Sequence, residues 1–386
     1  MTDYKEKQVY RYLIIAWIFV AIGFQGWRTL FNNFAVDEVG ITGIEVGAIQ
    51  SIREIPGFLS FLVIYLLIFI KEQRLSALSL LTMGIGVLFT GLLPSFEGLL
   101  ITTFVMSVGF HYFETTSSSL ILQNFNKIDS SIVFGKLRAV MSLTNIAVGS
   151  AIVGLSYILP IEMNFLLIGI ITVSGSIYLL LNPPEVDETH EQHKKFFLRK
   201  KYWLYYVLNF LSGSRRQIFV VFAVFLLVER YNFSVGEIAA LFVVNNIIGY
   251  FANPLIAKSI NIFGERKVLS FEYIALIFIF YAYTQWDWKW GVALLYILDH
   301  IFFNFSFGLK TYLQKIADPK DIAPSNAVGF AINHVAAVVI PFVGGVLWMS
   351  NWQLPFYVGV GLSVLSLGFV QVIKTQGERH KMKDKR

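Results

Sequence analysis

The sequence RTLFNNFAV at residues 28–36 returns as RQIFVVFAV at residues 216–224, which pairs Arg28 with Arg216. Further along, GIEVGAIQSIREIPG at 43–57 aligns without gaps with VGEIAALFVVNNIIG at 235–249. The identities are few, but they fall at arginine, acidic and glycine positions in the same order. A repeat of this kind indicates two related halves. Ionisable residues at equivalent places inside long apolar runs favour a secondary transporter.

The composition agrees with a membrane location. The 386 residues are 56% hydrophobic and 15% charged, with a mean hydropathy of +0.63. Soluble domains average about 25% charged residues. The chain has no cysteine, which excludes disulfides, thiolate metal sites and a thiol nucleophile. It also lacks a phosphate-binding Gly-x-x-x-x-Gly-Lys loop and a complete Gly-x-Ser-x-Gly motif, so we expect no enzyme activity, no cofactor and no bound metal.

Apolar runs of the length that crosses a bilayer, about 20 residues, come in two sets of six. The first set is 10–36, 43–70, 75–94, 97–122, 133–158 and 163–182, and the second is 203–228, 236–260, 268–286, 290–310, 325–349 and 354–374. A charged, proline-bearing segment separates them. We therefore expect an N-terminal bundle at 1–182, a cytoplasmic linker at 183–202, a C-terminal bundle at 203–374 and a basic tail at 375–386.

The distribution of lysine and arginine predicts the orientation. If the N-terminus is cytoplasmic, nearly all basic residues outside the spans fall in cytoplasmic segments, and the opposite face holds only Arg230 and Lys289. Both termini and the linker are then cytoplasmic, in an inner membrane of the bacterial type. The net charge of +6 is explained by this topology, and we expect no nucleic-acid partner.

One cytoplasmic loop has a motif that resembles a known family. The segment AKSINIFGERK at 257–267 is similar to the loop motif of the major facilitator superfamily, in which a small residue precedes an Asp and a Gly followed by basic residues. Asn261 stands at the Asp position, and Gly264, Arg266 and Lys267 follow. The resemblance implies an all-α integral membrane protein with twelve transmembrane helices in two six-helix bundles. It further implies a central cavity, lined by the first, fourth, seventh and tenth helices, that opens alternately to either side.

Polar residues spaced by three or four positions share one face of a helix, and several spans carry such faces. We predict that those forming the substrate site are Gln25, Arg28, Asn32, Arg53, Arg216 and Asn246. We predict that those coupling transport to protons are Glu114, His111, Glu54, Asp299 and His300. A central charged residue costs about 2.5–3.5 kcal/mol on insertion scales, so each must face water, substrate or a counter-charge.

Two interpretations of the arginines remain open. Arg28 and Arg216 either contact an anionic substrate or form structural ion pairs with Glu54, Glu114 or Asp299. Arg215 points about 100° away from Arg216 around the helix, which favours a helix–helix contact or outward snorkelling. Two glutamates have another role: TGIE at 42–45 and SVGE at 234–237 are capping boxes at helix starts.

The arginine pair resembles the organophosphate and phosphate branch of the superfamily. We therefore expect a monomeric secondary transporter, a symporter or antiporter, of a small organic or phosphorylated anion, with proton coupling or anion exchange. A multidrug exporter is the alternative within transport. A non-transporting sensor or a lipid scramblase on the same scaffold is the alternative from another class.

The basic-residue bias makes the topology testable. A fluorescent protein fused after Arg386 is expected to fold and fluoresce, because this end is cytoplasmic. A phosphatase that folds only in the periplasm is expected to be inactive at the same position. Activity of that phosphatase would overturn the prediction that both ends are inside.

Overall fold

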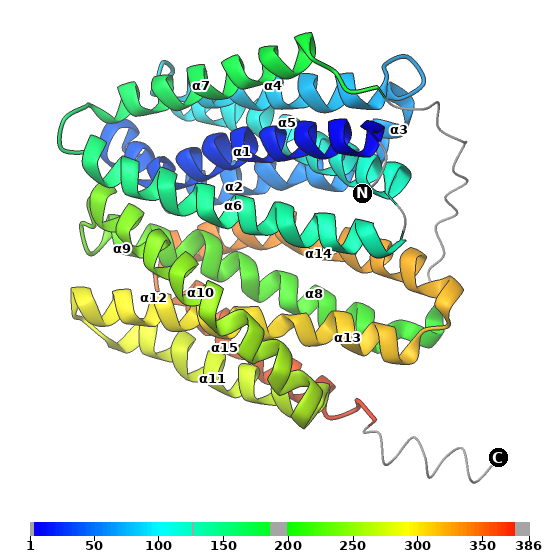
Figure 1. Cartoon of the computed structure of the whole chain (residues 1–386). Helices are drawn as coiled ribbons and strands as arrows, with labels where there is room; N and C mark the ends of the chain where they lie inside the picture. Colours follow the sequence, from blue (N-terminus) through cyan, green and yellow to red (C-terminus); the bar gives the residue numbers. More distant parts are fainter. Residues whose placement is uncertain (1–3, 126, 186–198, 375–386) are drawn as a thin grey trace. The chain divides into compact units, whose positions relative to one another are not determined.

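The computed structural model describes residues 4–125, 127–185 and 199–374. The middle of the predicted linker, 186–198, and the predicted tail, 375–386, lie outside these residues. The described residues form helices and no strands. Their contacts divide the chain into two compact units (Figure 1). Unit 1 takes the described parts of Met1–Gln192 with Asn232–Asn246, and unit 2 takes those of His193–Tyr231 with Ile247–Arg386.

Each predicted span corresponds to one helical segment, some of which change helix type along their length. The first six are α1 (Tyr4–Asn33) with the π-helix η1 (Phe34–Val39), α2 (Gly43–Phe58) with the 3-10 helix η2 (Leu59–Leu62) and α3 (Val63–Leu66), α4 (Glu72–Thr90), α5 (Phe96–Asn124), α6 (Lys127–Leu155) and α7 (Ile161–Leu181). The other six are η3 (Lys200–Tyr202) with α8 (Trp203–Gln217), η4 (Ile218–Ala223) and α9 (Val224–Glu229), α10 (Val235–Phe263), α11 (Glu265–Gln285), α12 (Lys289–Phe303) with η5 (Asn304–Ser306) and α13 (Phe307–Ile316), α14 (Pro319–Ser350) and α15 (Leu354–Val370).

Among the described residues, 10 helical segments are long and apolar enough to cross a membrane. The twelfth segment, Leu354–Val370, is apolar but shorter. The second segment is interrupted: Pro56 lies inside α2, and a 3-10 helix follows at Leu59. Proline removes a backbone N–H and crowds the preceding turn, which explains the change of helix type at the predicted Pro56–Gly57 bend.

The sequence repeat has structural counterparts at the start of the second helix of each half. Thr42 and Glu45 form the predicted capping box, with the Thr42 N–H donating to Glu45 Oε2 at 2.7 Å. Ser234 and Glu237 repeat it, with the Ser234 N–H donating to Glu237 Oε2 at 2.8 Å. In each half, the hydroxyl of the cap residue and the carboxylate of the glutamate thus accept hydrogen bonds from backbone N–H groups that would otherwise lack a partner.

The backbone just before the two caps also repeats. Gly40 and Asn232 each stand two residues ahead of the cap residue, and both are left-handed, with φ of 69° and 50°. Glycine and asparagine are the residues that adopt this region most readily. The chain therefore makes the same reversal between the first and second helices of each half.

A π-helix follows the repeated arginine in both halves. Arg28 precedes η1 (Phe34–Val39), and Arg216 precedes η4 (Ile218–Ala223). A π-helix widens one turn of an α-helix, and such turns occur frequently at functional sites. The first helix of each half thus contains a π-helix after the repeated arginine, although it begins six residues after Arg28 and two after Arg216.

In unit 1, glycines let the helices approach closely. α4 packs against α5 and α7, and α1 packs against α6 and α7. A Cβ at Gly86 would collide with the backbone of Met106, and one at Gly109 would collide with the backbone of Met83. Small residues at such crossings allow the close backbone contact that stabilises helices in a membrane.

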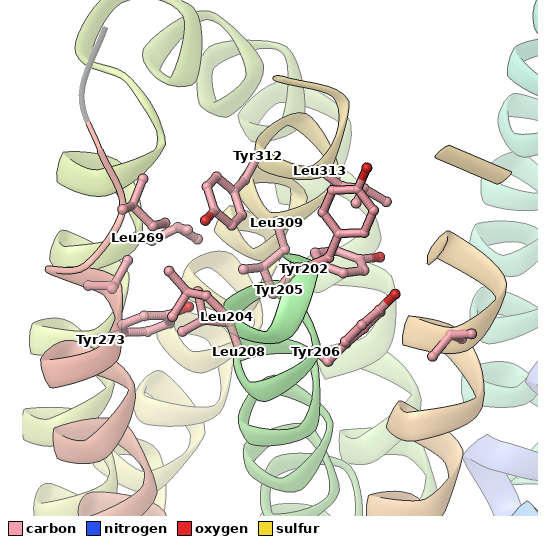
Figure 2. Packing of buried hydrophobic residues seen from close by; sticks show 13 residues of the cluster. Tyr202, Leu204, Tyr205, Tyr206, Leu208, Leu269, Tyr273, Leu309, Tyr312 and Leu313 are labelled. Carbon is pink, nitrogen blue, oxygen red and sulfur yellow. The ribbon is translucent and has the colours of Figure 1, made fainter. Parts of the chain in front are cut away.

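In unit 2, tyrosines and leucines form the core around α8 (Figure 2). Figure 2 shows rings from η3, α8, α11 and α13 gathered around one centre. The buried members include Tyr202, Tyr205, Tyr273, Tyr312 and Leu269. Both α8 and α11 contribute side chains to this core and carry charged residues described below.

The α4–α5 crossing predicts a stability difference between two glycines. Gly86→Ala is expected to lower the thermal unfolding midpoint of the purified protein, because overpacking costs about 1–3 kcal/mol. Gly154→Ala is the control, since a Cβ there meets nothing within 4 Å and alanine favours a helix by about 1 kcal/mol. Equal midpoints for the two variants would contradict the close packing.

Candidate functional site

Arg28 lies half-buried on α1 within unit 1, close to the start of α10. Its guanidinium carbon is 4.8 Å from the ring centroid of Phe242, which is 4% exposed. Stacking of this kind holds a guanidinium through the ring face and contributes about 0.5–2 kcal/mol. Within the described residues, Arg28 forms no ion pair and donates no hydrogen bond. The structural ion pairs considered for Arg28 are therefore not formed there.

The other predicted polar residues near Arg28 have mixed surroundings. Gln25 is buried and donates to the Thr29 hydroxyl at 3.2 Å. Asn32 is buried too, and its Oδ1 has no hydrogen-bond partner among the described residues. Asn246 donates to the Phe242 carbonyl at 2.7 Å. Unpartnered amide oxygens in an apolar surrounding are costly, so Asn32 is available to a ligand or to water.

Arg53 and Glu54 form a buried ion pair on α2. Arg53 reaches Glu54 Oε1 through Nη2 at 2.7 Å and through Nε at 3.2 Å, and both residues are under 10% exposed. Neighbouring residues project about 100° apart around a helix, which argues against a side-chain contact between them. The long Arg53 side chain nevertheless folds back far enough to reach the Glu54 carboxylate. Ser107 on α5 donates to the Arg53 carbonyl in the turn that Pro56 disturbs.

His111 and Glu114 lie together on α5, as their spacing predicts. His111 Nδ1 is 4.0 Å from Glu114 Oε2, with the His111 side chain 9% exposed and the Glu114 side chain 44% exposed. The Phe110 ring packs edge-on against His111 and stacks on Phe24 from α1. The pair therefore has one member in the protein interior and one that reaches its surface.

In unit 2, the two neighbouring arginines of α8 have opposite surroundings. Arg216 is exposed, whereas Arg215 is 3% exposed. Arg215 Nη2 is 3.6 Å from Glu272 on α11, Nη1 donates to the Ser366 hydroxyl on α15, and the guanidinium lies 4.3 Å from the centre of the Tyr273 ring. Arg215 thus makes a helix–helix contact, one of the two roles that the sequence allowed.

Asp299 and His300 differ in burial although they are neighbours on α12. Asp299 is 1% exposed, and its Oδ2 accepts no hydrogen bond among the described residues. His300 is half-buried, with its ring 6.2 Å from the ring of Phe219.

The predicted loop motif falls at the α10–α11 connection of unit 2. Gly264 has a φ of 80°, which explains why a glycine is needed there. Arg266 donates to Gln371 Oε1 at 3.3 Å, Lys267 is exposed, and the side chain of Asn261 lies outside what the structure describes. Glu265, where the resemblance favours a basic residue, is buried and forms an ion pair with Lys315 at 2.7 Å.

Sequence reasoning missed Glu272 and Gln217. Glu272 is 1% exposed and holds the guanidinium of Arg215. Gln217 is fully buried, and neither its Oε1 nor its Nε2 has a partner among the described residues. Glu272 does leave a signal, because it is a single acid inside an apolar span. No group of acidic or histidine residues that could hold a metal occurs in the described part of the chain.

The chain has helical segments long enough to cross a membrane, in two related halves, with charged groups buried between them. These features are those of a multi-pass membrane transporter. A family model described as "Major Facilitator Superfamily" matches residues 13–311. The chain belongs to this superfamily. Its predicted fold class, twelve transmembrane helices in two six-helix bundles, is confirmed.

Solved structures show the same fold at low sequence identity. The nucleoside transporter NupG, as a D323A mutant, gives a TM-score of 0.80 at 14% identity, covering 95% of this chain and 100% of that one. A bacterial homologue of the iron transporter ferroportin gives 0.75 at 14% identity, covering 94% and 97%. A bacterial homologue of the human lysosomal transporter Spinster gives 0.72 at 12%, covering 97% of both chains. No curated protein matches the sequence.

Proposed function

We propose that this transporter moves a small organic or phosphorylated anion by alternating access, with Arg28 as a primary anion contact. The observation that carries the proposal is the contrast among the arginines inside the spans. Arg53 is paired with Glu54 and Arg215 with Glu272. Arg28 has a stacked, half-buried guanidinium and no carboxylate partner within the described residues. An arginine held in this way presents its N–H groups to a carboxylate or phosphate.

Arg216 is the second proposed anion contact. It is exposed, it begins the second copy of the repeat, and a π-helix follows it as one follows Arg28. The guanidinium of an arginine at this position offers the same bidentate contact to a carboxylate or phosphate as that of Arg28. Arg53 is not a substrate contact in this proposal, because its side chain is paired with Glu54 within α2. Gln25 and Asn32 remain proposed polar contacts of the substrate.

We further propose that Glu114 couples transport to protons. It combines a partly exposed carboxyl with a buried histidine at 4.0 Å. A carboxyl in partial contact with water exchanges protons, and a neighbouring imidazole changes its affinity for them. The proposed orientation follows the basic-residue bias, with both termini cytoplasmic in an inner membrane.

The anion contact is tested first by a ligand screen. Purified protein is heated with inorganic phosphate, glycerol 3-phosphate, citrate or uridine, and a ligand that binds the native state raises the unfolding midpoint. An anion is expected to stabilise the protein. In Arg28→Lys and Arg216→Lys, its affinity is expected to fall at least about tenfold, equivalent to about 1.4 kcal/mol, because an ammonium does not reproduce the guanidinium fork.

Arg230→Lys is the matched control for this screen. Arg230 also stacks on an aromatic ring, that of Trp352 at 4.4 Å, but it lies outside the spans. Its replacement is expected to leave anion binding unchanged. Stabilisation by uridine alone, or unchanged anion binding in both Arg28→Lys and Arg216→Lys, would show that the solute is not recognised as an anion.

The coupling role is tested in proteoliposomes with the anion that the screen identifies. Glu114→Gln is expected to retain exchange of that anion and to lose accumulation driven by an imposed pH gradient, because glutamine keeps the shape and does not titrate. Glu97→Gln is the control, an exposed acid at the start of the same helix. Accumulation equal to that of Glu97→Gln would remove Glu114 from the coupling mechanism.

A further inference from the structure

Unit 1 has a cavity of about 290 Å³ between the start of α1 and the end of α7. The two helices pack against each other (Figure 1). α1 lines one side of the cavity with Gln8, Arg11 and Ile15, and α7 lines the other with Tyr178, followed by Pro184. Polar and apolar side chains therefore meet in one hollow, away from the residues of the proposed transport mechanism.

The cavity lies where two apolar spans end. The span of α7 stops at Leu181, and the cavity is lined by the residues on either side of this point, Tyr178 and Asn182. On α1 the long apolar run begins directly after Arg11. Tyrosine and arginine at the ends of membrane spans prefer the level of the lipid headgroups. The cavity is thus expected at the boundary between the acyl chains and water.

The charged group of the cavity is the guanidinium of Arg11. Arg11 is exposed, and within the described residues its guanidinium forms no ion pair and donates no hydrogen bond. Beside it, Gln8 Oε1 accepts from the backbone N–H of Glu185 at 3.3 Å, and Asn182 Nδ2 donates to the Tyr178 carbonyl at 2.9 Å. These bonds fix two amide groups next to a guanidinium that is open to an anion. Arginine binds phosphate oxygens through its fixed fork of N–H groups.

The neighbouring charges favour an anion as well. Between residues 5 and 15 the chain has three basic residues and one acid, Glu6. Lys7 is exposed one turn before Arg11, and Lys136 of α6 lies over the ring of Tyr10 at 5.7 Å. Glu185 reaches the cavity through its backbone N–H, which is itself a donor. Basic clusters at the end of a membrane span attract anionic lipid headgroups.

An exposed apolar stripe leads away from the cavity along α7. Its side chains recur at intervals of three, four or seven positions, which places them on one face of the helix; they are Met163, Leu167, Ile170, Ile177 and Leu181. Tyr178 of the cavity wall is exposed beside the end of this stripe. An apolar surface of this kind on a span is suited to contact with acyl chains.

We propose that the cavity binds an anionic phospholipid, with the headgroup phosphate on Arg11 and the acyl chains along the exposed face of α7. Gln8 and Asn182 supply hydrogen bonds to the polar part of the headgroup. The bound lipid bridges α1, α7 and the residues that follow α7. The site is independent of the proposed anion contact, because Arg28 lies 17 positions after Arg11, about 25 Å further along α1.

Native mass spectrometry of the delipidated full-length protein in a neutral detergent tests the site. Dioleoyl-phosphatidylglycerol is expected to form its first adduct at a concentration at least about fivefold lower than dioleoyl-phosphatidylcholine does, because the two lipids have the same chains and differ in net charge. Arg11→Gln is expected to weaken the phosphatidylglycerol adduct by a similar factor, since glutamine cannot neutralise the phosphate.

Arg74→Gln is the matched control. Arg74 is exposed at the same end of unit 1, where the Tyr12 hydroxyl donates to the Gln73 carbonyl at 2.6 Å, but it does not line the cavity. Its replacement is expected to leave the adduct unchanged, and so is Arg28→Lys. An excess of inorganic phosphate is expected not to displace the lipid. If Arg11→Gln does not fold, the comparison of the two lipids on wild type gives the answer.

Five outcomes would overturn the proposal. Equal binding of the two lipids, or an unchanged adduct in Arg11→Gln, would show that Arg11 recognises no anionic headgroup. Equal weakening in Arg74→Gln would reduce the effect to general surface charge. Displacement by inorganic phosphate would assign the cavity to a free anion, and loss in Arg28→Lys would place the lipid at the proposed substrate site. The thermal-shift screen tests that substrate site separately, so either proposal is able to fail while the other stands.

Discussion

A guanidinium buried among membrane-spanning helices must be neutralised, and unit 2 is built around that requirement at Arg215. Its three contacts come from two other helices: a carboxylate and an aromatic ring on α11 and a hydroxyl on α15. Removing one partner of such a buried pair costs about 3–5 kcal/mol. The same α11 tyrosine, Tyr273, belongs to the core in Figure 2, so the apolar packing holds the ring on which Arg215 stacks.

Four arginines inside the spans fall into two groups by their surroundings. Arg53 and Arg215 are buried against acids: Arg53 pairs with its neighbour on α2, and Arg215 joins α8 to α11. Arg28 is half-buried over Phe242, and Arg216 is exposed. A charge that is already neutralised has little to gain from a ligand, whereas one held by stacking alone gains a charge-assisted hydrogen bond. This difference separates Arg28 from the two paired arginines in the proposed mechanism.

The two halves share several backbone features and differ in the chemistry of their side chains. Capping boxes, the left-handed residues before them and the π-helices occur in both. At aligned positions, however, the first half has the ion pair Arg53–Glu54 and the second has Asn245 and Asn246. Asn245 is buried, with neither side-chain atom partnered among the described residues. The aligned positions of the second helix thus carry charged side chains in the first half and amide side chains in the second.

The sequence by itself determined the membrane class, the number and order of the spans and the capping boxes, because these depend on local hydrophobicity and on contacts only a few residues apart. It also found the repeat and the loop motif that led to the superfamily. Only the tertiary structure decided which charges meet. Arg53 folds back onto Glu54, and Arg215 reaches Glu272, 57 positions later in the chain. Helical periodicity assigns a side chain to a face, but the partner on that face depends on which helices pack together, and that is a property of the folded bundle.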